Sequence, residues 1–358
     1  MAIQRVSAER PVWAGPVARI LIVDDSVVAR AVIARMIDLG RGYAVAGAVS
    51  DVRAALSYLA AEKVDVILLD IEMPGIDGLT ALPDIVAAGG DAKVLIVSSA
   101  CEEGGAAAVQ ALALGAADTL VKPSNGRLIG SFADALEDKL SRLTQARSHR
   151  ASAPPARRLP APAVGDDFDI VAIGASTGGI HALSQVLRAL PSDFQVPILV
   201  TQHLPASFMP YFAAQVAILA GRPCDVATDH MRLRPGRVII APGDAHLRCT
   251  RLGDGGAALR LVRTRAPSGC MPSVDPMLAS VADVFGARAL GVVLSGMGRD
   301  GAEGAAALSA AGGVVIVQDE ASSVIWGMPG AVARGGHASA ILPPDDIGRL
   351  VALRRRPA

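Results

Sequence analysis

The stretch Val171–Leu183, which reads VAIGASTGGIHAL, combines a short apolar run, a glycine-rich turn and a segment with helical character. A strand that turns sharply into a helix is the repeating unit of proteins with parallel sheets. Further apolar runs follow at 197–202, 237–241, 289–295 and 313–317, separated by helix-like segments and by an alternating stretch at 247–263 typical of a hairpin. We therefore predict an α/β domain over residues 167–353, with its ligand site at the carboxyl ends of the strands.

A second block with the same alternation lies upstream. Its expected strands are 20–23, 64–70, 93–98 and 119–121, with helices that include 27–39 and 105–114. We predict a doubly wound, flavodoxin-like domain at residues 17–140. Between the two blocks, residues 141–166 hold four prolines and several arginines, which is typical of a flexible basic linker. Residues 1–16 form an extension, and residues 354–358 form a tail.

The bulk composition supports two ordinary globular domains. The chain has 358 residues, of which 51% are hydrophobic and 19% charged, and its formal net charge is zero. This balance gives no reason to expect a nucleic-acid or membrane partner. Arg5, Glu9 and Arg10 interrupt the N-terminus, no run reaches the ~18 apolar residues of a spanning helix, and the four cysteines show no metal-ligand spacing. We expect a cytoplasmic protein.

Polar residues gather where the strands of the first block end. Asp24 and Asp25 follow one strand, Asp70 ends another, Ser98 ends a third and Lys122 follows a fourth. Three carboxylates at one sheet edge repel one another unless a cation joins them, and hard carboxylate oxygens suit Mg²⁺. A lysine and a hydroxyl beside them can hold phosphoryl oxygens. The chemistry that fits is phosphorylation of an aspartate with Mg²⁺ as the cofactor.

The runs LIVDDS, LLDIEMPGIDG, VSS and VKPS, which begin at residues 21, 68, 97 and 121, resemble those of response-regulator receiver domains. The resemblance implies that Asp70 is the phosphoacceptor and that a sensor histidine kinase is the phosphodonor. It also implies that Mg²⁺ is held by Asp24, Asp25, Asp70 and the backbone carbonyl of Glu72, with Ser98 and Lys122 as switch residues. One position departs from the family pattern: Thr119 stands where many receivers have an aromatic switch residue.

The glycine-rich turn of the second block admits three interpretations. A dinucleotide-binding loop needs G-x-G-x-x-G, but Ser176 occupies the middle position. A phosphate-binding P-loop needs a lysine, and the turn has none. The third pattern, G-x-S-x-G from Gly174 to Gly178, resembles a nucleophile elbow, in which the serine stands above the sheet and a helix N-terminus faces an oxyanion.

A serine nucleophile needs a base and a carboxylate that orients the base. His203 directly follows the apolar run at 198–200, and Asp300 lies just past the run at 289–295. Both are therefore expected at the same sheet edge as Ser176. The order Ser, His, Asp along the chain differs from the order Ser, Asp, His of α/β-hydrolases, which indicates a separate family.

The motifs GASTGG, TQHLP, IIAPGDAHL, PSVD, SGMGRDGAEG and VQDEASSVIWGMP closely resemble those of the protein-glutamate methylesterases of bacterial chemotaxis. The resemblance implies hydrolysis of methyl esters on receptor glutamates and deamidation of certain receptor glutamines. It implies Ser176 as nucleophile, His203 as base and Asp300 as orienting carboxylate, with the backbone at Thr177 and Met297 holding the oxyanion and with no cofactor. Cys270 and Met271 replace a His-Arg pair that is frequent in the family.

The resemblance also implies that the unphosphorylated receiver covers the active site. Chemotaxis receptors are the expected substrates, so that contact with a membrane is peripheral and passes through them. Two alternatives remain open from the sequence: an inert adaptor that only binds receptors, and a phosphate-binding α/β domain.

Overall fold

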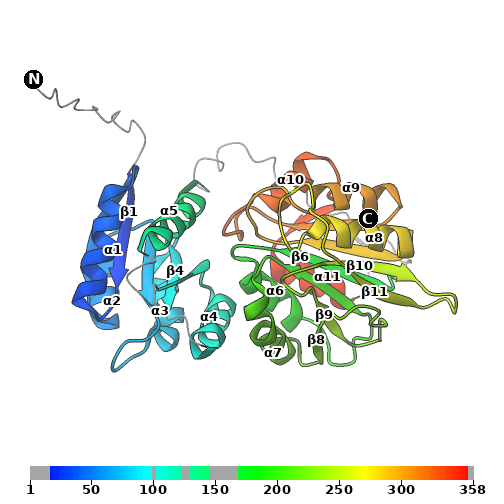
Figure 1. The fold of residues 1–358 in the computed structure, drawn as a ribbon, viewed down its shortest axis with the longest axis horizontal. Coiled ribbons are helices and arrows are strands. Elements are labelled where there is room, and N and C mark those ends of the chain that lie inside the picture. The colour runs from blue at the N-terminus through cyan, green and yellow to red at the C-terminus, as the bar shows by residue number, and fades with distance from the viewer. Residues whose placement is uncertain (1–16, 99–101, 123–128, 146–167, 354–358) are drawn as a thin grey trace, which may run out of the picture.

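The computed structural model describes residues 17–98, 102–122, 129–145 and 168–353. Within these ranges the chain forms two α/β units that lie side by side (Figure 1). The expected N-terminal extension, most of the expected linker and the expected tail lie outside the described residues. No helix in the described ranges has the length and apolar character to cross a membrane.

The first unit is a five-stranded parallel sheet with the order β2-β1-β3-β4-β5. Its elements alternate between strand and helix: β1 (Ala18–Val23), α1 (Val27–Leu39), β2 (Tyr43–Val49), α2 (Val52–Ala61), β3 (Val66–Asp70), α3 (Gly78–Gly89), β4 (Lys93–Ser98), α4 (Glu102–Leu114), β5 (Asp118–Val121) and α5 (Ile129–Gln145). Alternate strand residues point to opposite faces, so that α1 and α5 cover one face and α2, α3 and α4 cover the other.

The second unit is a seven-stranded parallel sheet with the order β14-β13-β12-β6-β7-β9-β8, plus an antiparallel hairpin of β10 and β11. Its elements are β6 (Ile170–Ala175), α6 (Gly179–Arg188), β7 (Ile198–Gln202), η3 (Ala206–Phe208), α7 (Met209–Ala220), β8 (Cys224–Val226), β9 (Val238–Ile240), β10 (His246–Arg251), β11 (Ala257–Val262), α8 (Val274–Phe285), η4 (Gly286–Arg288), β12 (Ala289–Val293), α9 (Ala302–Ala310), β13 (Val314–Gln318), α10 (Met328–Arg334), β14 (Ala340–Leu342) and α11 (Pro344–Ala352). Helices α6, α7 and α11 cover one face, and α8, α9, α10 and the hairpin cover the other.

The predicted fold class is confirmed, with differences at the edges of the sheets. The half-buried strand β2 and the short strands β8 and β14 were not predicted, because none of them forms a continuous buried apolar run. Helix α5 extends to Gln145, so that residues 141–145 are helical and do not belong to a linker. Buried Leu140 and Leu143 continue the apolar face of α5 past the expected boundary.

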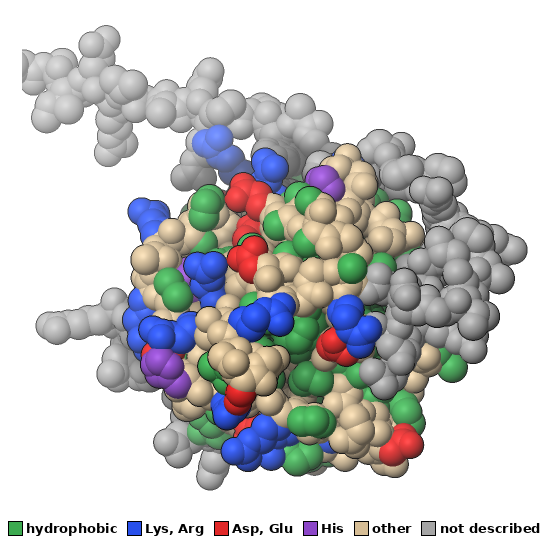
Figure 2. Space-filling view, turned by 90° about the vertical axis from the view of Figure 1, so that its right-hand side faces the viewer, with side chains coloured by type: hydrophobic (Ala, Val, Ile, Leu, Met, Phe, Trp, Pro, Cys, Tyr) green, Lys and Arg blue, Asp and Glu red, His purple; other side chains and the backbone are tan. Residues whose placement is uncertain are grey.

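Charges on the outer face of the second unit are mixed. Figure 2 shows Lys and Arg side chains interspersed with Asp and Glu, without a large area of one sign. In the second unit Arg263 pairs with Asp244 and Arg288 with Asp169. The face drawn in Figure 2 therefore carries charges of both signs.

Parallel strands bring the predicted polar residues to the edges of the sheets. In each sheet the chain first adds strands on one side of its first strand and later adds the others on the opposite side. The point at which it changes sides lies beside β1 in the first unit and beside β6 in the second. The carboxyl ends of strands on either side of such a point leave a crevice in which ligands bind. Asp24 and Asp70 lie at this place in the first sheet, and Ser176 and His203 lie at it in the second.

A buried cation holds the loop after α6 to the end of α7. Arg222 is 6% exposed, and its guanidinium donates hydrogen bonds of 2.6 Å to the carbonyl oxygens of Phe194 and Pro191. Its Nε donates a third bond, of 3.2 Å, to the carbonyl oxygen of Ala220. The planar fork of an arginine suits this arrangement, whereas the point charge of a lysine cannot satisfy three carbonyls in these directions.

We expect Arg222→Lys to lower the free energy of unfolding by about 1–3 kcal/mol, because it leaves buried carbonyl groups without donors. Denaturant-induced unfolding followed by circular dichroism measures the change. Arg234→Lys is the matched control at an exposed position and should change the stability by less than about 0.5 kcal/mol. Equal effects of the two substitutions would show that the Arg222 hydrogen bonds contribute nothing to stability.

Candidate active site

Ser176 lies in the turn between β6 and α6. Its backbone N–H donates a 3.0 Å hydrogen bond to the carbonyl oxygen of Ser295, and its carbonyl accepts one of 3.0 Å from Gln202 Nε2. Gly178 ends the turn with a φ of 75°, and a Cβ there would lie 2.4 Å from Val324. Only glycine fits this turn, which places Ser176 directly before the N-terminus of α6.

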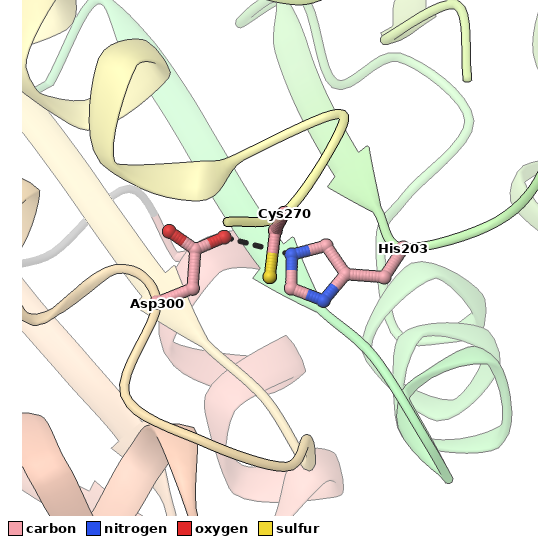
Figure 3. A group of neighbouring side chains, drawn as sticks. All are labelled: His203, Cys270 and Asp300. Carbon is pink, nitrogen blue, oxygen red and sulfur yellow. Dashed lines mark hydrogen bonds and ion pairs between the residues drawn. The ribbon is translucent and has the colours of Figure 1, made fainter. Parts of the chain in front are cut away.

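His203 and Asp300 form a direct pair at the same edge of the sheet. His203 Nε2 lies 2.7 Å from Asp300 Oδ2, and Figure 3 shows the other ring nitrogen, Nδ1, turned away from the carboxylate. His203 follows β7, and its backbone N–H donates a 3.1 Å hydrogen bond to the carbonyl oxygen of Ala175, next to Ser176. The imidazole is therefore oriented by the carboxylate, with Nδ1 left for a second partner.

The Asp300 carboxylate is held by donors from the start of α8. Ser273 Oγ donates a 2.7 Å hydrogen bond to Oδ1, and the backbone N–H of Val274 donates one of 2.8 Å to Oδ2. The N–H of Gly301 adds a 3.1 Å bond to Oδ1. Asp300 is only 2% exposed, so these donors replace the water that a carboxylate otherwise needs.

The pair shifts the pKa of both its members. Burial by itself lowers the pKa of His203, but hydrogen bonds to Asp300 and Cys270 outweigh burial and raise the pKa to about 9. Burial by itself raises the pKa of Asp300, but hydrogen bonds from His203, Ser273 and Val274 outweigh burial and hold the pKa well below its usual range. At neutral pH the resting pair is therefore an imidazolium and a carboxylate.

The structure brings Ser176, His203 and Asp300 to one place. Of the two hydrogen bonds expected among their side chains, the one between His203 and Asp300 is formed. Ser176 and His203 line the same cavity, of about 630 Å³, and no hydrogen bond joins their side chains in the described part of the protein. A protonated imidazole has no free lone pair with which to accept a serine proton. Catalytic hydrogen bonds often tighten only when substrate binds.

The two expected oxyanion positions lie near Ser176, since a Cβ at Gly296, next to Met297, would lie 2.8 Å from the Ser176 Cβ. Thr177 follows Ser176, and Met297 lies in the loop after β12, where its side chain is 38% exposed. The Thr177 carbonyl accepts a 2.8 Å hydrogen bond from Ser295 Oγ, which fixes the peptide that follows the nucleophile. The backbone N–H groups of Thr177 and Met297 have no hydrogen-bond partner within the described ranges, so both are available to an oxyanion.

The acidic residues of the first unit also meet as expected. Asp24, Asp25 and Asp70 each offer a carboxylate oxygen, and these atoms lie within 4.8 Å of one another. Lys122 Nζ lies 2.6 Å from Asp70 Oδ2 and 3.0 Å from Asp24 Oδ2. Burial raises the pKa of Asp70, and the ammonium of Lys122 opposes part of that rise. Asp24 Oδ2 is buried, so its ion pair with Lys122 stands in for the water that the carboxylate has lost.

The remaining predicted residues of the first unit lie around this cluster. Ser98 is buried at the end of β4, and its carbonyl accepts a 2.7 Å hydrogen bond from the backbone of Lys122. The backbone N–H of Glu72 donates a 3.1 Å bond to Asp70 Oδ1, so Glu72 is adjacent to the carboxylate cluster. Thr119 lies in β5 and lines the 630 Å³ cavity instead.

The first unit contacts the nucleophile turn directly. The backbone N–H of Gly178 donates a 3.0 Å hydrogen bond to the carbonyl oxygen of Ala117, and Thr177 Oγ1 lies 3.4 Å from Asp118 Oδ2. Helix α4 packs against α6, α7 and η3, and Figure 1 shows α4 on the side of the first unit that faces α6 and α7. The cavity that holds Ser176 is therefore lined by both units, with Lys122, Phe132 and Lys139 on the side of the first unit.

Sequence reasoning missed the residues that support Asp300. Ser273 lies in the PSVD motif, and its backbone N–H donates a 2.9 Å hydrogen bond to Nδ1 of His246. His246 is 1% exposed and also bonds the carbonyl oxygen of Thr264 through Nε2, at 2.7 Å. These residues are far from Asp300 in sequence; the PSVD motif contains Ser273 and the IIAPGDAHL motif contains His246, but neither motif indicates that the two residues meet at Asp300.

We expect His203 to titrate near pH 9 in the resting protein and closer to its ordinary 6.5 in Asp300→Asn, which removes the carboxylate. Because the folded pKa is the higher one, the stabilising contribution of the pair is complete below pH 6.5 and is lost as the pH rises through about 9. Side-chain ¹H–¹⁵N NMR measures the pKa, and His203→Gln identifies the resonance. A His203 pKa of 6.5 in the unsubstituted protein would contradict this interpretation.

Comparisons with known proteins agree with this arrangement. Residues 171–351 match the CheB methylesterase family, and residues 20–132 match the response regulator receiver domain. The chain is 41% identical to a protein-glutamate methylesterase/protein-glutamine glutaminase of Caulobacter vibrioides, over 94% of this chain and 99% of that protein. It is 38% identical to the corresponding protein of Azospirillum brasilense, over 93% of this chain and 92% of that protein.

A solved structure resembles the second unit. The CheB methylesterase catalytic domain of Thermotoga maritima is 34% identical, with a TM-score of 0.50, and covers 53% of this chain and 99% of that domain. The match spans the sheet that carries Ser176, His203 and Asp300. The chain therefore belongs to the CheB methylesterase family and carries a response regulator receiver domain ahead of its methylesterase domain.

Proposed function

We propose that this protein is a serine esterase that removes methyl groups from glutamates of chemotaxis receptors, deamidates certain receptor glutamines, and is controlled by phosphorylation of Asp70. The observation that carries the proposal is the His203–Asp300 pair beside Ser176, in a chain whose relatives are named for these two activities. Its place of action is the cytoplasm, where a sensor histidine kinase supplies the phosphoryl group. Resetting the receptors' methylation resets their sensitivity.

Hydrolysis proceeds in two steps. With Nδ1 unprotonated, His203 accepts the proton of Ser176 as the oxygen attacks the glutamyl carbonyl. It then donates that proton to the methoxide oxygen as the bond from the carbonyl carbon to this oxygen breaks, which releases methanol. Water attacks the resulting acyl-serine with His203 again as the base, which releases the glutamate and restores the serine. For a glutamine substrate the first leaving group is ammonia. No cofactor enters this cycle.

Two features of the fold assist the chemistry. The N–H groups of Thr177 and Met297 face no acceptor among the described residues and hold the negative oxygen of the tetrahedral intermediate. Asp300 keeps its charge throughout, because its low pKa prevents protonation by His203, and it stabilises the imidazolium that forms.

In the receiver domain, Asp24, Asp25, Asp70 and the Glu72 carbonyl would hold Mg²⁺. The close approach of the three carboxylates supports this assignment, since they repel one another unless a cation joins them. When bound, Mg²⁺ supplies charge neutralisation for the transferred phosphoryl group. Asp70 is the acceptor, Lys122 pairs with the phosphoryl oxygens and Ser98 is the switch hydroxyl.

The receiver restrains the esterase through its contacts with the nucleophile turn. The Ala117 carbonyl occupies the N–H of Gly178, and the receiver forms one wall of the cavity in front of Ser176. Lys122 pairs with Asp70 at 2.6 Å and directly follows β5, so a phosphoryl group on Asp70 exchanges this pair for a new one and shifts β5, which carries Asp118 and borders Ala117. A coupling of about 1–3 kcal/mol between these sites changes the activity about 5–150-fold.

An inert adaptor that only binds receptors is the second candidate. The buried, hydrogen-bonded Asp300 and the glycine-dependent turn at Ser176 oppose it, because binding alone requires neither feature. A fluorophosphonate probe separates the two functions, since only a reactive serine is labelled.

We expect Ser176→Ala to lower the rate of receptor demethylation by several orders of magnitude while receptor binding persists, because the nucleophile is lost and the fold is kept. Methanol release from methylated receptor membranes measures the rate. Ser192→Ala, at an exposed serine in the loop after α6 of the same domain, is the matched control and should retain full activity. Undiminished methanol release by Ser176→Ala would refute the assignment of the nucleophile.

We expect the isolated methylesterase domain, residues 168–358, to be about 5–150-fold more active than the unphosphorylated full chain, because the receiver wall of the cavity is removed. A phosphodonor should activate the full chain and should leave Asp70→Asn at its basal rate. An isolated domain slower than the unphosphorylated chain would rule out simple inhibition by the receiver.

A further inference from the structure

A third chemically active side chain lies against the His203–Asp300 pair. One ligating atom from each of His203, Cys270 and Asp300 lies within 4.8 Å of the other two. Figure 3 shows the Cys270 sulfur beside the hydrogen bond that joins the imidazole to the carboxylate. Cys270 comes from the loop between β11 and α8, and the esterase chemistry described above does not use its thiol.

We propose that His203, Cys270 and Asp300 form a Zn²⁺ site whose occupation inhibits the esterase. An imidazole nitrogen, a thiolate sulfur and a carboxylate oxygen are the donors that zinc binds in proteins. Around one tetrahedral zinc, such atoms lie about 3.3–3.8 Å apart, so small side-chain rotations convert the observed cluster into a ligand set. A thiolate and the Asp300 carboxylate together balance the charge of the ion.

The site is open on one side. His203 and Cys270 are half-buried and line the 630 Å³ cavity, whereas Asp300 lies buried behind them. Zinc can enter from the cavity, and its fourth position then faces the same space, where water completes the coordination. Three protein ligands with one open position are a common zinc arrangement.

Zinc at this place disables the base. A neutral imidazole that binds a metal through Nε2 carries its remaining proton on Nδ1. Nδ1 is the nitrogen that must accept the proton of Ser176, so zinc-bound His203 donates at the position where it must accept. The ion also takes Asp300 away from the imidazole. Mg²⁺ does not compete here, because it prefers oxygen ligands such as those of the receiver cluster.

The binding test uses the full chain, stripped of metals, with excess Mg²⁺ to occupy the receiver cluster. Co²⁺ serves as a spectroscopic substitute for Zn²⁺, and we expect a thiolate-to-cobalt charge-transfer band that saturates at one ion per chain and disappears when Zn²⁺ is added. Cys270→Ala should lose the band. Cys224→Ser should keep it, since Cys224 lies in β8, outside the cluster. A band that persists in Cys270→Ala, or no band in the unsubstituted chain, overturns the site.

The inhibition test rests on the proposed esterase function, whereas the Co²⁺ spectrum measures metal binding alone. A failure of the proposed zinc site can therefore be distinguished from a failure of the proposed esterase function. With each variant compared with its own zinc-free rate, Cys270→Ala should need at least about tenfold more Zn²⁺ for half inhibition of methanol release. Cys270→His, which supplies another zinc ligand, should restore sensitivity. Unchanged sensitivity in Cys270→Ala, or zinc binding through the thiolate without inhibition, overturns the proposal.

Discussion

The buried carboxylate of Asp300 is the constraint around which the methylesterase domain is organised. A carboxylate removed from water is costly unless donors surround it, and Asp300 receives hydrogen bonds from Ser273, Val274, Gly301 and His203. Those donors come from the start of α8, the loop after β12 and the end of β7. One charge thus ties three segments together and, through its low pKa, keeps the imidazole oriented beside the nucleophile.

The turn that carries Ser176 makes hydrogen bonds to both domains. Inside the domain, Ser295 and Gln202 fix the peptides on either side of Ser176. From outside, the receiver adds the Ala117 carbonyl at Gly178 and closes one wall of the cavity. The contacts from the receiver and those inside the domain therefore meet on the single turn that carries Ser176.

Much of the fold could be predicted from local patterns in the amino-acid sequence. Parallel strands are short, buried and apolar, so local pattern alone assigns the residues at their ends, such as Asp24, Asp70, Ser176 and His203, to the edges of the sheets. Strand β2 was missed because it is only half-buried, and the end of α5 was placed too early because Arg142 begins a stretch rich in arginine and proline. Edge strands and helix ends depend on tertiary contacts more than on local pattern.

The sequence by itself determined two α/β domains and the chemical groups at their sheet edges, because periodicity and strand-end positions are local properties of the chain. Only the tertiary structure decided which nitrogen of His203 faces Asp300, that Ser273 and His246 support that carboxylate, and that Cys270 lies against the pair. These contacts join loops far apart in sequence. Their geometry depends on how both faces of the sheet pack, and no local pattern records it.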